Sequence, residues 1–224
     1  MQRIFAEIIR IMKLVIFGAT GFSGKKILAE ALQRGHEVTV LARNRGSIAI
    51  NHPRLTIHEG NVLDPFTVAN VLRGQEAVIQ CLGVGGKGDG KPTTFVSDAT
   101  LLIIEEMKKA GVQRLIAMSN VGAGNSIAFH PRIFTKWILP YFMKWLQVII
   151  DDKNRMETLI MNTSLQWTIA RFPNIVDKPG KGRCTISLDG KGLTLSITLA
   201  DMAACLIDFL QDGTYTGQAP SISN

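Results

Sequence analysis

Short apolar runs and longer amphipathic stretches alternate along this chain of 224 residues. The short runs, four or five residues each, are typical of buried strands. In the longer stretches apolar residues recur at helical spacing, which is typical of helices that cover a sheet. Strands that alternate with helices predict a parallel sheet with helices on both faces. The pattern therefore predicts a doubly wound α/β fold.

The bounds of these elements follow from where each pattern begins and ends. Gly35 and Gly111 stand where glycine commonly ends a helix, and Thr198 is a residue type that caps a helix N-terminus. We expect strands at residues 13–17, 37–41, 55–58, 77–81, 114–118 and 166–170. We expect helices that end near residues 34, 72, 110, 162 and 210, the fourth of them broken near Pro140.

Length and composition indicate one domain. Hydrophobic residues make up 46% of the chain and charged residues 19%, which is ordinary for a globular protein, and the length is too short for two full α/β domains. We expect residues 12–224 to form this single domain, with an aromatic-rich helical insertion at about residues 129–150. Residues 1–11 precede the first strand as an N-terminal extension, either an upstream start or a loosely docked helix.

Charge and cysteine usage narrow the class of protein. The formal net charge is +7, but Lys and Arg never form a run longer than a pair, which favours a solvated basic surface over a nucleic-acid-binding face. The three cysteines are far apart without metal-ligand spacing, which argues against a disulfide framework and a zinc site and fits a cytoplasmic protein. Charges and a proline break the longest apolar segment, so we expect no membrane span.

Three glycines stand where the first predicted strand meets the first predicted helix. Gly18, Gly21 and Gly24 form a GxxGxxG pattern, and a second strand follows it. A dinucleotide pyrophosphate binds at a helix N-terminus, where unpaired N–H groups face it and glycine lets the backbone come close. In this strand–turn–helix–strand setting the pattern predicts a dinucleotide-binding unit at residues 12–43. The alternative is a glycine-rich turn without a ligand.

Arg43 indicates which dinucleotide binds. About twenty residues after the motif, an NAD-binding protein places an acidic residue on the ribose hydroxyls. This chain instead has Arg43 at the end of the second strand, with Arg45 nearby. A guanidinium can hold a 2′-phosphate through two hydrogen bonds, so the sequence favours NADP(H). The alternative is an exposed charge at a strand end.

Several motifs at predicted strand ends resemble those of the atypical short-chain dehydrogenase/reductases, in particular their NAD(P)H-binding, NmrA-like group. Within it the chain is most similar to the flavin reductase and biliverdin-IXβ reductase family. The resemblance runs from about residue 12 to the C-terminus and is carried by Gly18–Gly24, Arg43, Gly60–Val62, Gln80–Gly83, Ser119, Asp151–Met156, Thr168–Pro173 and Ser187–Gly192.

The resemblance implies a single-domain NAD(P)-binding Rossmann fold, NADP(H) as cofactor, a small aromatic or conjugated acceptor, and a monomer or homodimer. It also implies a set of cofactor-binding residues. These are Gly18, Thr20, Gly21, Phe22, Ser23 and Gly24 at the pyrophosphate, Arg43 at the 2′-phosphate, Asn61 and Val62 at the adenine, Leu82 and Gly83 along the ribose and nicotinamide side, and Ser119, Pro173, Asn174 and Ile175 near the nicotinamide.

The chain departs from the family at several of these positions. Asn61 replaces the family's usual Asp, and its amide can still bond to adenine. Lys153 and Asn174 stand where the flavin reductases often have His. Between Ser119 and Lys153 the chain carries extra aromatic residues, so the substrate side is remodelled.

The catalytic group of ordinary short-chain dehydrogenases is missing. Neither Tyr141 nor Tyr215 is followed by Lys four residues later, so the YxxxK motif is absent, which disfavours alcohol–ketone chemistry. The catalytic candidates are Ser119, which could orient a carbonyl, and Lys153, which could bind ribose or supply positive charge. The alternatives are a strand-end hydroxyl that bonds the backbone and a solvent-facing helix residue.

Two segments leave several interpretations open. Residues 133–150 could form a lid over a flat substrate, a helix that binds a membrane surface or a partner, or an amphipathic helix packed on the sheet. The glycine-rich run at residues 83–90 could be a mobile flap or a plain surface loop.

Two functional hypotheses follow. The first is an NADPH-dependent oxidoreductase that reduces a flat conjugated acceptor, such as a flavin, quinone or tetrapyrrole, by direct hydride transfer. Such acceptors delocalise charge and can take their proton from water, so a site without a dedicated acid suits them. The second is a non-catalytic NADP(H) sensor of the NmrA-like type that acts through a protein partner.

Overall fold

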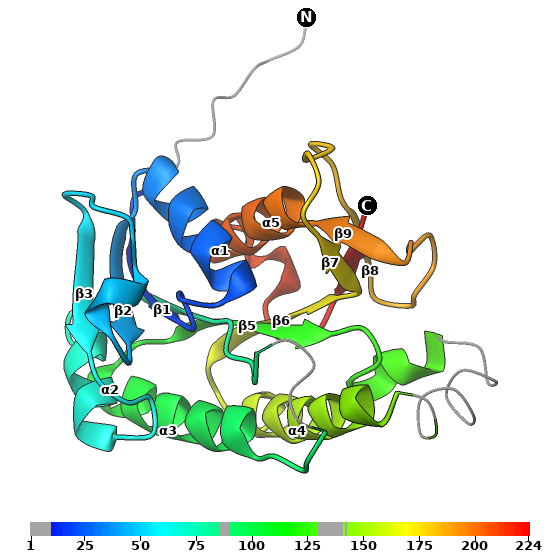
Figure 1. Ribbon diagram of the computed structural model, residues 1–224, viewed down its shortest axis with the longest axis horizontal. Coiled ribbons are helices and arrows are strands. Elements are labelled where there is room, and N and C mark those ends of the chain that lie inside the picture. The colour runs from blue at the N-terminus through cyan, green and yellow to red at the C-terminus, as the bar shows by residue number, and fades with distance from the viewer. Residues whose placement is uncertain (1–9, 86–89, 130–140, 142) are drawn as a thin grey trace, which may run out of the picture.

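The computed structural model describes residues 10–85, 90–129, 141 and 143–224. Its centre is a sheet of eight strands in the order β3-β2-β1-β4-β5-β6-β10-β8 (Figure 1). All neighbours in it are parallel except β10 and β8, which pair antiparallel. The strands are β1 (Lys13–Phe17), β2 (Glu37–Ala42), β3 (Leu55–Glu59), β4 (Ala77–Gln80), β5 (Arg114–Asn120), β6 (Gln166–Phe172), β8 (Thr185–Ser187) and β10 (Ser221–Ser223). A separate pair consists of β7 (Asn174–Val176) and β9 (Ser196–Thr198).

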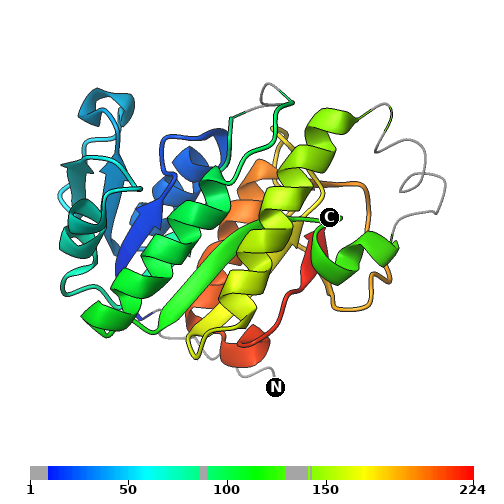
Figure 2. The same ribbon diagram turned by 90° about the horizontal axis from the view of Figure 1, so that it is seen from below.

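Helices cover both faces of the sheet, as the sequence pattern predicted (Figures 1 and 2). α1 and α5 pack on one face, whereas α2, α3 and α4 lie side by side on the other. Each layer encloses its own apolar cluster, because alternate side chains of the central strands point to opposite faces. The helices are α1 (Phe22–Gln33), α2 (Pro65–Leu72), α3 (Phe95–Ala110), α4 (Lys144–Met161) and α5 (Leu199–Gln211), with short 3-10 helices at Arg45–Ser47, Gly124–Phe129 and Gly213–Tyr215.

The predicted helix ends are confirmed by local geometry. Gly35 and Gly111 adopt φ values of +85° and +75°, the left-handed conformation that glycine adopts at low cost. Thr198 caps α5, because its side chain accepts a hydrogen bond from the backbone N–H of Asp201. These signals depend only on residues near one another in the chain, so the sequence alone carries them.

The C-terminal part of the sequence prediction was incomplete. The glycine-rich stretch after β6 contains β7, β8 and β9, and the chain ends in β10. Strands of three residues are too short to show an alternating pattern, so only their pairing identifies them. The fourth expected helix, which was to end near residue 162, begins in the described part of the chain at Lys144, and residues 130–140 and 142 lie outside the described residues.

The order of the strands determines where a ligand can bind. From β1 the chain builds outward through β2 and β3, and then returns to build the other half from β4 through β6. In open parallel sheets, ligands bind beyond the carboxyl ends of the strands at this reversal. Here the reversal lies between β1 and β4, and the glycine turn follows β1 directly.

Candidate functional site

Two glycines at the turn between β1 and α1 each allow a different close approach of the backbone. Gly18 has φ +92°, and a Cβ atom there would lie 2.7 Å from the carbonyl oxygen of Cys81, so the turn lies against the end of β4. A Cβ atom on Gly24 would lie only 2.0 Å from the carbonyl oxygen of Gly18. Gly18 therefore permits the turn, and Gly24 permits α1 to pack on it, as a dinucleotide-binding turn requires.

The amides at the start of α1 are not capped by a side chain. The helix begins after Gly21, which is exposed and has no side chain to accept from them. In contrast, Asp64 caps α2 and Thr198 caps α5, while the Asp152 carboxylate accepts from the backbone N–H groups of Val96 and Ser97 in α3. Unsatisfied N–H groups at the positive end of the helix dipole attract an anion. A pyrophosphate fits this cradle of backbone and glycine.

The other residues predicted to bind pyrophosphate and adenine surround this turn or follow β3. Thr20 and Ser23 are half-buried, and the Phe22 ring is 58% exposed. Asn61 is exposed and uses its side-chain oxygen to accept the backbone N–H of Leu63 at 3.0 Å. Its amide N–H₂ group is the part left to meet a base.

Arg43 lies directly after β2 and is exposed to solvent. Within the described residues no carboxylate pairs with its guanidinium; the nearby Glu59 accepts instead from the backbone N–H of Arg45 at 3.1 Å. Because β1 and β2 are adjacent parallel strands, their carboxyl ends place the glycine turn and Arg43 at the same edge of the sheet. Arg43 thus has donors available for a phosphate.

Lys153 joins the ends of β4 and β5. Its Nζ donates to the carbonyl oxygens of Met118 at 2.7 Å and Leu82 at 3.1 Å, and its third contact is the Met156 sulfur at 3.8 Å. The residue is only 5% exposed, so the alternative of a solvent-facing helix residue is wrong. Leu82 is half-buried, whereas Gly83 beyond it is exposed. Lys153 therefore holds the backbone of Leu82, from which the chain continues to Gly83.

Burial alters the acidity of Lys153 and of the neighbouring thiol. It lowers the pKa of Lys153 to about 8, against the opposing effect of Cys81, Asp152 and Glu157. Burial also raises the pKa of Cys81 to about 12, although the Lys153 charge opposes it. The Cys81 thiol donates to the carbonyl oxygen of Phe17 at 3.1 Å, so it stays protonated and ties β4 to β1.

Ser119 belongs to a buried polar network at the end of β5 and β6. Its Oγ donates to Glu157 Oε1 at 2.7 Å, and Glu157 in turn pairs with Arg171, whose Nη2 lies 2.6 Å from Oε2. Both charged side chains are 2% exposed. Arg171 Nη1 also donates to Asn125 Oδ1 at 2.6 Å, and the Gly124 N–H donates to Asn154 Oδ1 at 2.7 Å. The network thereby anchors the loop after β5.

Sequence reasoning missed Glu157. It lies one helical turn after Lys153 on α4, a spacing that places both on one face of the helix. Arg171 gave a second signal, because a charge within a buried strand needs a partner of opposite charge. The sequence did not show which carboxylate that partner was.

The last predicted residues, Pro173, Asn174 and Ile175, follow β6 at the same edge of the sheet. Asn174 is exposed at the start of β7 and is in register with Ser196 of β9. Ile175 packs on the apolar cluster beneath α5. The predicted residues therefore form two groups: an exposed group at the glycine turn and Arg43, and a more enclosed group at the ends of β4, β5 and β6.

Comparison with known proteins agrees with this geometry. The sequence matches the NAD(P)H-binding family over residues 18–213. The chain belongs to that family. The prediction of a nicotinamide dinucleotide as cofactor is thereby confirmed, and so is the resemblance to the NAD(P)H-binding group. None of the described helices is long and apolar enough to cross a bilayer.

The relatives and neighbours span most of the chain. The chain is 27% identical over 208 residues to the uncharacterized protein YwnB of Bacillus subtilis, which covers 89% of this chain and 92% of that protein. The anaerobillin reductase ChuY of Escherichia coli O157:H7 has a TM-score of 0.76 at 20% identity, over 94% of this chain and 96% of that one. A short-chain dehydrogenase/reductase of Veillonella parvula in complex with NADP has a TM-score of 0.75 at 17% identity, over 96% and 95%. These structures confirm the fold.

Proposed function

We propose that this protein is an NADPH-dependent reductase of a flat, conjugated acceptor such as a flavin, a quinone or a linear tetrapyrrole. The observation that carries the proposal is that both catalytic candidates are already engaged. The Ser119 hydroxyl donates a hydrogen bond to the buried Glu157, and the Lys153 ammonium donates to two backbone carbonyls and a sulfur. A ring that delocalises charge and takes its proton from water needs no acid from the protein.

The cofactor half of the proposal rests on exposed donors. The amides at Phe22 and Ser23 would hold the pyrophosphate in the cradle that Gly18 and Gly24 create, whereas the Gly21 amide donates to the Gly18 carbonyl at 3.1 Å and closes the turn. Arg43 would hold the 2′-phosphate that distinguishes NADP(H) from NAD(H). Support comes from the NADP complex of the Veillonella parvula protein, which shares the fold.

The remaining residues would shape the site around the nicotinamide, which supplies a hydride when the cofactor is bound. Thr20 would line the pyrophosphate, and Asn61 with Val62 the adenine. Leu82 and Gly83 would run along the ribose, held in place by Lys153. Pro173, Asn174 and Ile175 would close the far side, with Ser119 beneath them. The chemistry named for ChuY, reduction of a tetrapyrrole, is of the class proposed here.

A decisive experiment offers FMN, a quinone and biliverdin in turn and follows the loss of NADPH absorbance. We expect at least one acceptor to accelerate NADPH oxidation, and NADPH deuterated at the transferred position to slow the reaction if hydride transfer limits it. Parallel runs with NADH are expected to be slower at equal concentration. If NADPH binds tightly but no acceptor of this class accelerates its oxidation, the reductase proposal is wrong.

That outcome would favour a second function, a non-catalytic NADP(H) sensor that acts through a protein partner. The same observation favours it, because a sensor also needs no free acid near the nicotinamide. The feature expected to separate the two, a cleft lined by residues 129–145, lies largely outside the described residues. The acceptor assay therefore decides between them.

A further inference from the structure

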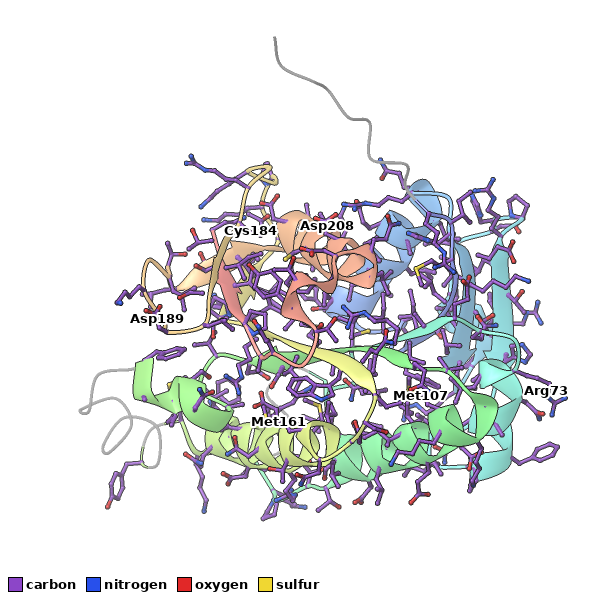
Figure 3. The ribbon with its side chains drawn as sticks, turned by 180° about the vertical axis from the view of Figure 1, so that it is seen from behind. Arg73, Met107, Met161, Cys184, Asp189 and Asp208 are labelled. Carbon is purple, nitrogen blue, oxygen red and sulfur yellow. The ribbon has the colours of Figure 1, made fainter. Side chains whose placement is uncertain are left out.

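Two cysteines, Cys184 and Cys205, are neighbours on the side of the sheet that α1 and α5 cover, and their side chains share a hydrogen bond. Cys184 stands directly before β8, and Cys205 is in the middle of α5. The Cys184 sulfur is 3.8 Å from the carbonyl oxygen of Asp201, which is one helical turn before Cys205. Figure 3 shows Cys184 beside α5. Cys184 is half-buried, whereas Cys205 is 5% exposed.

The segment that carries Cys184 is clamped onto this helix. The Asp201 carboxylate accepts from the backbone N–H groups of Lys181 at 2.7 Å and Gly182 at 3.0 Å. A Cβ atom on Gly180 would lie 3.2 Å from the Ala200 side chain, so the backbone of the segment lies close on α5. The two sulfurs therefore stay near each other through contacts that do not involve the cysteines themselves.

The hydrogen bond between the two thiols shifts their pKa values in opposite directions. A hydrogen bond with Cys205 lowers the pKa of Cys184, against the opposing effects of burial and of Asp201 and Asp208. The same hydrogen bond, together with burial, raises the pKa of Cys205, which Arg34 opposes. Hydrogen peroxide can reach the half-buried Cys184 more readily than the buried Cys205 beside it, which is the arrangement of an attacking cysteine with a resolving cysteine.

We propose that Cys184 and Cys205 are a site of reversible oxidative modification that forms an intramolecular disulfide with hydrogen peroxide as oxidant. The Cys184 thiolate attacks one peroxide oxygen, the O–O bond breaks, and the departing hydroxide takes up a proton, which leaves a sulfenic acid on Cys184. The Cys205 sulfur then attacks the Cys184 sulfur, loses its proton, and displaces the hydroxyl as water. Two thiols are oxidised, and one peroxide is reduced to two waters. A dithiol reductant reverses the change.

Cys81, the third cysteine of the chain, provides an internal control, because its thiol is expected to be unreactive. Its thiol donates to a backbone carbonyl, and its pKa is raised to about 12. The thiolate is the reactive form, so Cys81 is expected to resist oxidation. The proposed oxidation of Cys184 and Cys205 does not depend on the reductase proposal, and each is tested separately.

The test treats the reduced full-length protein with a small excess of hydrogen peroxide, blocks free thiols with N-ethylmaleimide under denaturing conditions, and measures intact mass and peptide masses. We expect one blocked thiol, Cys81, and a linked pair of peptides that contain Cys184 and Cys205. Dithiothreitol added before blocking is expected to restore three blocked thiols. Cys184→Ser is expected to abolish the linked pair, whereas Cys81→Ser is expected to retain it.

Three results would overturn the proposal. These are three blocked thiols after oxidation, a disulfide between two chains, and a sulfinic acid on Cys184 with Cys205 still free. Because Cys205 is buried, Cys205→Ser could fold poorly, and the peptide masses of the wild-type protein decide the question without it.

Discussion

The two halves of the sheet's carboxyl edge treat their polar groups in opposite ways. At the ends of β1 and β2, the first amides of α1 have no side-chain cap and Arg43 is exposed without a carboxylate partner among the described residues. At the ends of β5 and β6, Ser119, Glu157 and Arg171 are buried and bonded to one another. Both regions are rich in polar atoms, but the donors of the first are exposed and free in the described residues, whereas Ser119 and Arg171 donate within their own network.

This difference separates a binding role from a supporting role. A donor that already has a buried partner can serve a ligand only by giving up that partner, which costs about 1–3 kcal/mol when the partner stays unsatisfied. Unused donors carry no such cost. We therefore propose that the β1–β2 half binds the anion and that the β5–β6 half holds the loop after β5 in position.

The largest expected effect tests the supporting role of the β5–β6 half. Glu157→Ala leaves the Arg171 charge buried without its carboxylate, so the free energy of unfolding in urea is expected to fall by about 3–5 kcal/mol. Asp189→Ala is the matched control, because it removes the carboxylate of an exposed ion pair with Lys191 and is expected to change stability little. Equal losses in the two variants would show that the buried network does not stabilise this half.

The second prediction separates the two roles of glycine in the β1–α1 turn. Gly24→Ala forces the turn to move, so we expect stability to fall by about 1–3 kcal/mol and NADPH binding to weaken with it. In Gly21→Ala the new Cβ lies an ordinary 3.4 Å from the Gly18 carbonyl, and φ of −73° suits alanine. Gly21→Ala should therefore unfold like the wild type, yet bind NADPH more weakly in a fluorescence titration.

Arg43→Asp tests whether the exposed charge reads the 2′-phosphate. One or two charge-assisted hydrogen bonds are lost, so the preference for NADPH over NADH should fall by about tenfold to a hundredfold, measured as the ratio of the two dissociation constants. Arg73→Asp makes the same charge change after α2, beside Lys13 and Glu37 at the amino ends of β1 and β2, and should leave the ratio unchanged. A similar fall in both variants would mean that only the overall charge matters.

The smallest effect concerns Lys153. Its folded-state pKa of about 8 lies below the ordinary 10.5, so between these values the unfolded chain binds the extra proton and stability rises with pH. From pH 8 to pH 9 the wild type should gain about 1 kcal/mol relative to Lys153→Met, measured by urea unfolding at each pH. The comparison with the variant removes contributions from titratable groups that do not interact with Lys153. Parallel stability curves for the two proteins would contradict the burial of this amine.

Local signals made much of the fold predictable. The strand β1, the glycine turn and the start of α1 are adjacent in sequence, and their backbone requirements restrict the residue types at Gly18 and Gly24. The cap at Thr198 and the helix ends at Gly35 and Gly111 are similarly local. For this reason the cofactor class, the sheet and its covered faces followed from the sequence, and the family match confirms the cofactor class.

The sequence by itself thus determined the α/β architecture and the dinucleotide cradle, since both depend on residues close together along the chain. Only the tertiary structure decided that Lys153 is a buried link between β4 and β5, that Ser119 bonds to Glu157, and that Cys184 meets Cys205. Those pairs join segments separated by many residues, and their spacing in the sequence carries no signal. Burial and hydrogen bonding, which decide whether a polar side chain is free to react, exist only after the segments have packed together.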